Sequence, residues 1–262
     1  MSPSTTHDPT DPHAMASLPD PGLVHAPAVL ARFKRALNLS MVAVIVLALV
    51  FFLGGEAPAA LTVQPQKLAG LIGIATAPLL HGSVEHLAAN TLSVLILGTL
   101  AGTVFPRATL RALPLIWFGA GFGTWLIGTG GYHLGASGVT HGLGYLVFTL
   151  AALRRDRASI AAALIAFFFF GGMVLSVLPM EMGVSWESHL SGALAGIVAG
   201  LLFRRADPIP PRRIYSWELK PEAALGDMLE PASPEEVPVI WRRAPSDEAV
   251  ILRFRPRPPP EQ

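Results

Sequence analysis

The stretch that decides the fold covers residues 112–153 and reads ALPLIWFGAGFGTWLIGTGGYHLGASGVTHGLGYLVFTLAAL. It contains no Asp, Glu, Lys or Arg, and it is about twice as long as the ~20 apolar residues that one helix needs to cross a bilayer. The chain must therefore turn back within it. Clustered glycines in residues 128–135 supply the turn, because glycine disfavours a helix interior and permits tight turns. We expect one span to end near Ile127 and the next to begin near Ser137.

Four more runs without acidic or basic residues have the length of a membrane span. They are residues 36–55, 87–106, 158–180 and 188–203. The last is short for a bilayer, which suits a helix packed inside a bundle. Residues 67–85 are also apolar, but glycine and proline interrupt them, so we expect an interfacial or re-entrant first outer loop there. The sequence thus predicts an all-α polytopic membrane protein with six transmembrane helices.

The composition agrees with lipid as the solvent. Hydrophobic residues make up 52% of the 262 positions and charged residues only 14%, whereas soluble domains carry about 25% charged residues. The 19 basic and 18 acidic residues leave a formal charge of +1, which gives no basis for nucleic-acid binding. Without cysteine, the chain has no disulfides, no thiolate catalysis and no cysteine-bound metal. We expect no nucleic-acid partner, no metal and no cofactor.

The basic residues beside the spans predict the orientation of the chain. Those on one side are Arg32, Lys34, Arg35, Arg107, Arg111, Arg154, Arg155, Arg157, Arg204 and Arg205, and the other side has only Lys67. Because basic residues concentrate on the cytoplasmic side, we expect both termini in the cytoplasm and the protein in the plasma (inner) membrane. The expected domains are a disordered N-terminal tail (1–35), a membrane domain (36–203) and a Pro-rich C-terminal tail (204–262).

Polar side chains within spans are costly in lipid and usually functional, so their positions matter. Here they form three groups, at the starts of the second, fourth and sixth spans, and all three fall near the same face of the membrane. The groups are His81, His86 and Asn90; Gly135, Ser137, Gly138 and His141; and His189, Gly192 and Gly196.

This grouping predicts a nucleophile and a base on neighbouring helices. A serine hydroxyl attacks an amide only if a nearby base takes its proton, and His189 can do so for Ser137 if the two helices approach closely. Glycines in small-xxx-small spacing on both spans permit that approach. The oxyanion of the tetrahedral intermediate needs donors, for which His86, Asn90 and the backbone N–H of Ser137 are candidates.

With these motifs the sequence resembles the rhomboid family of intramembrane serine proteases. Three motifs in order carry the resemblance, across residues 36–203: His81-x4-His86-x3-Asn90, Gly135-x-Ser137-Gly138 and His189-x2-Gly192-x3-Gly196. The resemblance implies a Ser137–His189 dyad without a third carboxylate, and oxyanion contacts from His86 and Asn90. It also implies transmembrane protein substrates cleaved near the outer face of the bilayer, and a structural role for His81, bonding within the loop region.

The sequence departs from the family pattern at two places. The residue four positions after the serine is commonly an aromatic that stacks on the catalytic histidine, and here it is His141, a second titratable group. The first outer loop often contains a Trp-Arg pair, and residues 54–80 contain none. Trp117 and Trp125 read as packing or interface residues.

Other functions remain open from the residues alone. A serine in a transmembrane helix usually bonds back to a carbonyl, and membrane histidines can form a proton or metal relay. Against a cation route, the spans lack acidic residues, and Glu85 and Glu187 fall at span boundaries. A His-Glu-x-x-His metalloprotease motif and an intramembrane pair of aspartates are both absent from the sequence. The alternatives are therefore a non-catalytic rhomboid-like protein that binds membrane clients and, third, a small-solute or proton transporter.

Overall fold

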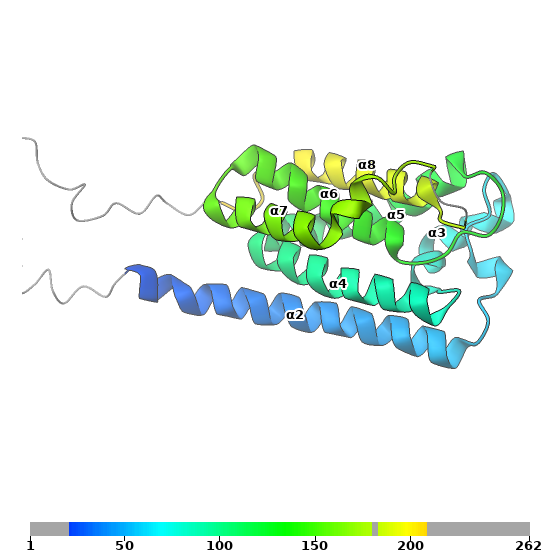
Figure 1. The fold of residues 1–262 in the computed structure, drawn as a ribbon, viewed down its shortest axis with the longest axis horizontal. Helices are drawn as coiled ribbons and strands as arrows, with labels where there is room; N and C mark the ends of the chain where they lie inside the picture. The colour runs from blue at the N-terminus through cyan, green and yellow to red at the C-terminus, as the bar shows by residue number, and fades with distance from the viewer. Residues whose placement is uncertain (1–20, 180–182, 209–262) are drawn as a thin grey trace, which may run out of the picture. The chain divides into compact units, whose positions relative to one another are not determined.

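The computed structural model describes residues 21–179 and 183–208, and this part of the chain is helical (Figure 1). The long helices are α2 (Pro21–Gly54), α4 (Val84–Val104), α5 (Pro106–Ile127), α6 (Ser137–Arg154), α7 (Arg157–Phe170) and α8 (Trp186–Phe203). The short helices are η1 (Ala59–Leu61), η2 (Leu68–Leu71), α3 (Gly73–Thr76), η3 (Ala77–Leu79) and, after α7, η4 (Gly171–Val174). The expected all-α polytopic architecture is confirmed.

Within the described residues, five helical segments are long and apolar enough to cross a membrane. They are Ala28–Gly54, Val84–Val104, Pro106–Ile127, Arg157–Val174 and Trp186–Phe203. The sixth long helix, α6, is less apolar because it packs against α4, α5, α7 and α8 and buries most of its residues. A helix surrounded by protein needs less apolar surface than one that faces lipid.

Two expected boundaries were wrong. The first helix begins at Pro21, inside the segment expected to be a disordered tail, because Ala and Leu favour helix and a helix extends at low cost once nucleated. The fifth span was expected to run to residue 180, but α7 ends at Phe170 and a 3₁₀ turn follows. Gly171 and Gly172 account for this early end, since glycine is a poor helix former. The other parts of the two predicted tails, residues 1–20 and 209–262, lie outside the described residues.

Glycines bring α6 and α8 into backbone contact. A Cβ added to Gly192 would collide with the carbonyl oxygen of Gly138, and one added to Gly196 would collide with that of Gly142. The two helices therefore meet along the small-residue faces that the sequence places on them. Any larger side chain at these positions would push apart the helices that carry Ser137 and His189.

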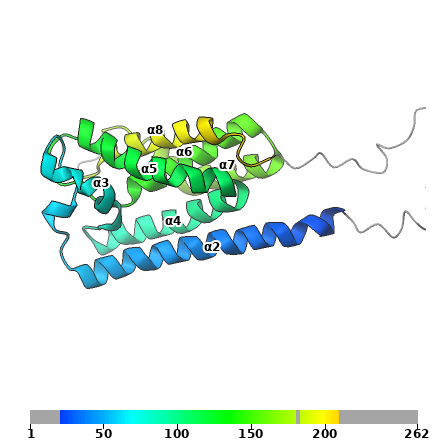
Figure 2. The same ribbon diagram turned by 180° about the vertical axis from the view of Figure 1, so that it is seen from behind.

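A second small-residue seam joins α2 to α4. A Cβ added to Gly98 would lie 2.6 Å from Ser40 Oγ, and one added to Gly102 would lie 2.9 Å from Ala36 Cβ. Both views show α2 beside α4, with the other helices on the far side of α4 (Figures 1 and 2). Ala36 of α2 lies beside Gly102 of α4. The first turns of the membrane span in α2 are therefore at the same end of the bundle as the last turn of α4.

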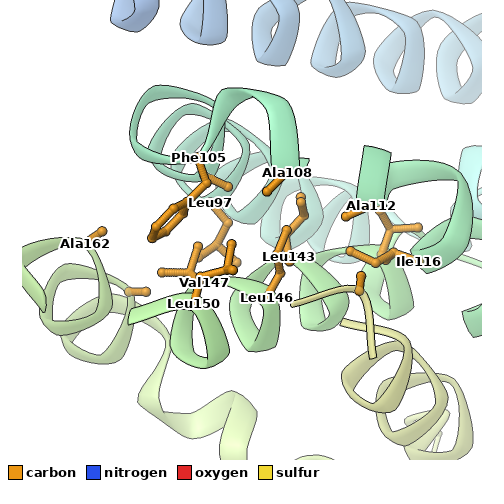
Figure 3. Close-up of a cluster of buried hydrophobic side chains, with 14 of the residues drawn as sticks. Leu97, Phe105, Ala108, Ala112, Ile116, Leu143, Leu146, Val147, Leu150 and Ala162 are labelled. Carbon is orange, nitrogen blue, oxygen red and sulfur yellow. The ribbon is translucent and has the colours of Figure 1, made fainter. Parts of the chain in front are cut away.

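The apolar core lies between α4, α5 and α6, with small residues of α7 and α8 packed against it (Figure 3). Leu146 and Val147 of α6 are fully buried against Leu97, Phe105 and Ile116. Burying a large aliphatic or aromatic side chain in a close-packed interior fixes its neighbours as well as itself. The core thus holds α6, which begins at the predicted nucleophile, in a rigid setting.

The first loop, residues 55–83, is hydrogen bonded to α5 through Trp117 and Trp125, the two tryptophans predicted to be packing or interface residues. Trp125 Nε1 donates to Lys67 O at 2.9 Å, and Trp117 Nε1 donates to Ala75 O at 3.1 Å. In addition, Gln66 N donates to Trp125 O at 2.9 Å. These bonds anchor the loop without the Trp-Arg pair. We call this end of the bundle the loop end.

The opposite end is held by a buried carboxylate that follows α8. Asp207 Oδ1 accepts from Arg107 N at 3.0 Å and Oδ2 accepts from Ala108 N at 2.9 Å, which caps the start of α5. Arg154 donates from Nη1 to Asp207 O at 3.2 Å and from Nε to Asp156 Oδ2 at 3.0 Å. The end of α8, the α4–α5 turn and the α6–α7 turn therefore meet at one end.

We call this the basic end, because the chain gathers its span-flanking basic residues there. The ten that the sequence places on one side lie in the first turns of the α2 span or in the turns and helix ends joined by Asp207 and Arg154. Lys67, on the other side in that assignment, lies in the first loop at the loop end.

Candidate active site

The segment before Ser137 passes close to the first polar group, which contains His86 and Asn90. Gly135 has φ of +112°, a conformation that favours glycine, and its N–H donates to Ala77 O at 2.9 Å. A Cβ added to Gly135 would lie 2.5 Å from His86 Cε1 and 3.6 Å from Asn90 Nδ2. The backbone leading to Ser137, the first residue of α6, therefore lies against His86 and beside Asn90.

The third polar group reaches α6 through a stack of two histidines. The rings of His141 and His189 lie 3.8 Å apart, centroid to centroid, at 13° to each other. His141 Nδ1 bonds to Ser137 O at 2.7 Å, one turn back along α6, and its Nε2 bonds to Ser176 Oγ at 2.8 Å. His141 thus stacks on His189, as the sequence suggests for this position, and links it to Ser137.

Hydrogen bonds determine the tautomers of these rings. His189 Nδ1 lies 3.0 Å from Ser176 O, and a carbonyl oxygen can only accept, so Nδ1 carries the proton. A neutral His189 therefore keeps its lone pair on Nε2. The same argument places the His141 proton on Nδ1, so Nε2 of neutral His141 accepts from the Ser176 hydroxyl.

Ser137 and His189 are not hydrogen bonded to each other. Among residues 21–179 and 183–208, neither Ser137 Oγ nor His189 Nε2 has a hydrogen-bond partner. Catalytic hydrogen bonds are often long in ligand-free enzymes and tighten only in the substrate complex. The free pair is thus compatible with a nucleophile and base that meet when substrate binds.

The predicted oxyanion donors keep unused donor capacity. Asn90 is buried, and its Nδ2 donates to His86 O at 3.1 Å, one turn back on α4. An amide nitrogen has two N–H donors, so one remains. The His86 ring makes no hydrogen bond within the described chain and lies edge-on to His81, with 5.1 Å between centroids.

His81 was expected to bond within the loop, and there the structure differs. It is only 4% exposed, and neither of its ring nitrogens has a hydrogen-bond partner in the part of the chain that the structure describes. Burial, together with the neighbouring His86, lowers the pKa of His81 to about 4, although the nearby Leu79 backbone opposes the shift. His81 is therefore neutral at physiological pH and packs against His86.

Sequence reasoning missed a polar network beside the site. Glu187 is 2% exposed, not at a solvated boundary, and its Oε1 accepts from Thr129 N at 3.1 Å and Thr129 Oγ1 at 2.7 Å. Next to it, His133 Nδ1 bonds to Ser185 Oγ at 2.6 Å and Nε2 bonds to Gly130 O at 2.8 Å. Only the placement of Glu187 two residues before His189 hinted at such a role.

A water-sized cavity of about 20 Å³ lies behind the first turn of α6. Gly138, Ser188 and Thr124 are among its lining residues. Such a volume holds about one water molecule. No group of three or more His, Asp or Glu side chains that could bind a metal ion occurs among the described residues.

Comparison with known proteins agrees with this arrangement. The rhomboid domain model matches residues 68–206, from η2 to just beyond α8 and including all the polar groups described above. No solved structure matches.

Two mycobacterial relatives are each described only as an uncharacterized protein. The one from Mycobacterium tuberculosis is 39% identical over 149 residues, which cover 53% of this chain and 62% of the relative. The one from Mycobacterium leprae is 37% identical over 142 residues, covering 50% of this chain and 56% of the relative. The chain therefore spans about three fifths of the length of these relatives. From the domain match and the fold together, the chain belongs to the rhomboid family.

Proposed function

We propose that the protein is an intramembrane serine protease that hydrolyses peptide bonds of transmembrane proteins. The observation that carries the proposal is the state of His189: its Nδ1 is committed to Ser176 O, so a neutral ring keeps its lone pair on Nε2. The ring also stacks on His141, which is bonded to Ser137. A base of this kind next to a serine at a helix start is what acyl transfer requires.

The proposed reaction begins when a substrate carbonyl lies over Ser137. Ser137 Oγ attacks the carbonyl carbon while His189 Nε2 takes the hydroxyl proton. The free N–H of Asn90, the His86 ring and the Ser137 backbone N–H stabilise the oxyanion. His189 then gives its proton to the leaving amine, and water cleaves the acyl-enzyme with His189 again as base.

One observation favours a second function, the binding of membrane clients without cleavage. Ser137 and His189 are not hydrogen bonded in the described structure, and a purely binding protein would not need them to meet. Both functions predict contact with transmembrane helices. Only the protease requires Ser137 Oγ.

The experiment that separates the two uses the purified full chain in liposomes with a set of transmembrane reporters that carry helix-breaking residues near one membrane face. The protease predicts cleavage by wild type and none by Ser137→Ala or His189→Ala. Binding of the same reporters to wild type and Ser137→Ala without cleavage by either would assign the client-binding function.

We further propose that both termini lie in the cytoplasm and that the loop end faces outward, in the plasma membrane. The gathering of basic residues at one end supports this orientation. Because the chain has no cysteine, Ser233→Cys and Leu68→Cys can each be probed in whole cells with an impermeant thiol reagent. The proposal requires labelling of Leu68→Cys alone, and labelling of Ser233→Cys from outside contradicts it.

A further inference from the structure

Glu187 is a buried carboxylate that the dyad does not use. Its Oε1 accepts two hydrogen bonds, from the backbone N–H and the hydroxyl of Thr129. Among the described residues the only ion pair joins Arg154 and Asp156, so Glu187 forms none. Burying an unpaired carboxylate is costly, and such a group is retained only where its hydrogen bonds have a use.

Glu187 does not complete a catalytic triad. The nitrogen of His189 that a triad acid would bind, Nδ1, is already bonded to Ser176 O. The carboxylate instead accepts hydrogen bonds from Thr129, in the connection between α5 and α6. Its role therefore lies in that connection.

A second bond ties the same two segments together. His133 Nε2 lies 2.8 Å from Gly130 O and must carry the proton, so His133 Nδ1 accepts from the Ser185 hydroxyl at 2.6 Å. Ser185 is the N-cap residue of α8, yet its side chain makes no capping bond. A hydroxyl that would normally stabilise its own helix thus binds the α5–α6 connection instead.

The connection, residues 128–136, delivers the nucleophile. On its other side, His133 and Val63 exchange two backbone hydrogen bonds of 3.0 and 2.9 Å, and Gly135 N bonds to Ala77 O. The connection is therefore fixed to the first loop on one side and to α8 on the other. It ends at Ala136, directly before Ser137, while α8 carries the base, His189, two residues after Glu187.

We propose that Glu187 and His133 are positioning residues that lock the nucleophile segment onto the helix of the general base. This inference rests on the proposed protease function. The bonds that Thr129 donates to Glu187 and that Ser185 donates to His133 set the position of Ser137 relative to His189, across the glycine seam of α6 and α8. Since a misplacement of about 1 Å can cost about 100-fold in rate, this lock acts on turnover and not only on stability.

The test measures the second-order rate of Ser137 labelling by a fluorophosphonate in detergent, per folded protein. Glu187→Ala is expected to lower that rate about 10- to 100-fold. Glu187→Gln keeps an Oε1 acceptor for the Thr129 N–H and hydroxyl, so it should stay within about threefold of wild type. Thr129→Val should have a smaller effect than Glu187→Ala, and no further effect when combined with it.

Asp207→Ala is the matched control. Asp207 is also a buried carboxylate that accepts from two donors, but at the basic end. The Asp207→Ala variant should have a lower melting temperature than wild type, and its folded fraction should be labelled at the wild-type rate. Labelling of Glu187→Ala at the wild-type rate would overturn the inference, and so would a Glu187→Gln rate as low as that of Glu187→Ala.

Hydrogen exchange separates this inference from the proposed function. The Thr129 amide should exchange at least about tenfold faster in Glu187→Ala than in wild type, because its acceptor is gone. If wild type is not labelled but Thr129 is protected in this way, the protease function fails and the lock survives as structure only. Equal Thr129 exchange in both proteins overturns the lock whatever the labelling shows. Should Glu187→Ala not fold, Thr129→Val carries the same comparison of labelling rates.

Discussion

The two ends of the helical bundle differ in how far their titratable side chains are hydrogen bonded. At the basic end, both Asp207 oxygens accept from backbone N–H groups and Arg154 bonds to Asp156 and to the Asp207 carbonyl. At the loop end, Ser137 Oγ, His189 Nε2 and both His81 nitrogens have no partner among the described residues. The first arrangement gives stability, whereas the second leaves reactive groups free.

Under the proposed protease function, this difference separates the groups that stabilise the fold from the groups that would react. Unpaired polar groups away from water cost free energy, so they persist where a function needs them. The hydrogen bonds of Glu187 and His133 offset part of this cost, because they fix the backbone around the free groups. Substitutions of the predicted catalytic groups at the loop end should therefore lower turnover, whereas substitutions at the basic end should affect unfolding.

The largest effect is expected for Asn90→Ala at the loop end. Loss of one oxyanion donor typically raises the barrier by about 2.7–4 kcal/mol, or about 100- to 1000-fold in rate. Because the charge exists mainly in the transition state, kcat should fall and KM should change little. Steady-state cleavage of a transmembrane reporter measures both. An unchanged kcat with a raised KM would assign Asn90 to substrate binding.

As the pH falls, titration at the loop end should lower the free energy of unfolding at a higher pH than titration at the basic end. The pKa of His81 is lowered to about 4 from 6.5 in the unfolded chain, so its contribution is complete above pH 6.5 and is lost as the pH falls towards 4. That loss lowers the free energy of unfolding as the pH falls. Thermal melts between pH 7 and 4 should show it in wild type, and His81→Gln should flatten the curve.

Asp156 gives the corresponding titration at the basic end. Burial alone would raise its pKa, but hydrogen bonds from Ser159 and the charge of Arg154 outweigh that effect and lower the pKa below its usual 3.8. Its stabilising contribution is therefore present above that value and lost only in stronger acid. Asp156→Asn should lower the melting temperature by a similar amount at every pH between 7 and 4, so that the dependence on pH in this range is unchanged. A large flattening by Asp156→Asn in this range would reverse the comparison.

Asp207→Ala should destabilise the basic end without affecting turnover. It leaves the N–H groups of Arg107 and Ala108 without their acceptor, at a cost of about 1–3 kcal/mol. Chemical denaturation in a fixed detergent measures the loss, and Asp207→Asn, which keeps one acceptor oxygen, should recover part of it. A drop in the kcat of folded protein would show that the two ends are coupled.

His141→Phe is expected to have the smallest effect. Phenylalanine keeps a ring to stack on His189 but loses the bonds to Ser137 O and Ser176 Oγ. Loss of about 1 kcal/mol of positioning would lower kcat/KM about 3- to 10-fold. His141→Ala, which also loses the stack, should be slower. Equal rates for the two variants would mean that stacking has no part in holding His189.

Much of the fold follows from the sequence because charge-free runs of span length leave few alternatives in lipid. The turn within residues 112–153, the start of α6 at Ser137 and the contact of α6 with α8 all follow from the order of glycines and charges. The helix ends do not, because they depend on local propensity. Helix formers before residue 36 extended α2, and Gly171 with Gly172 ended α7 early.

The catalytic candidates could be predicted because each lies within a motif, whereas their supports could not. Ser176 bonds to both histidines from a segment with no motif of its own. Glu187 and Thr129 are 58 positions apart in the chain, and an acid at a span boundary normally reads as solvent-facing. Such partners are defined by tertiary contact alone.

The most direct test of the Ser137–His189 account is to locate the adduct that a fluorophosphonate forms on the purified full chain. After digestion, mass spectrometry should find the phosphonyl group on Ser137 and on no other serine. Ser137→Ala should carry no adduct, and His189→Ala should react at least about 100-fold more slowly, because a general base contributes 100- to 10,000-fold. An adduct on another serine, or equal reaction of His189→Ala and wild type, would contradict the account.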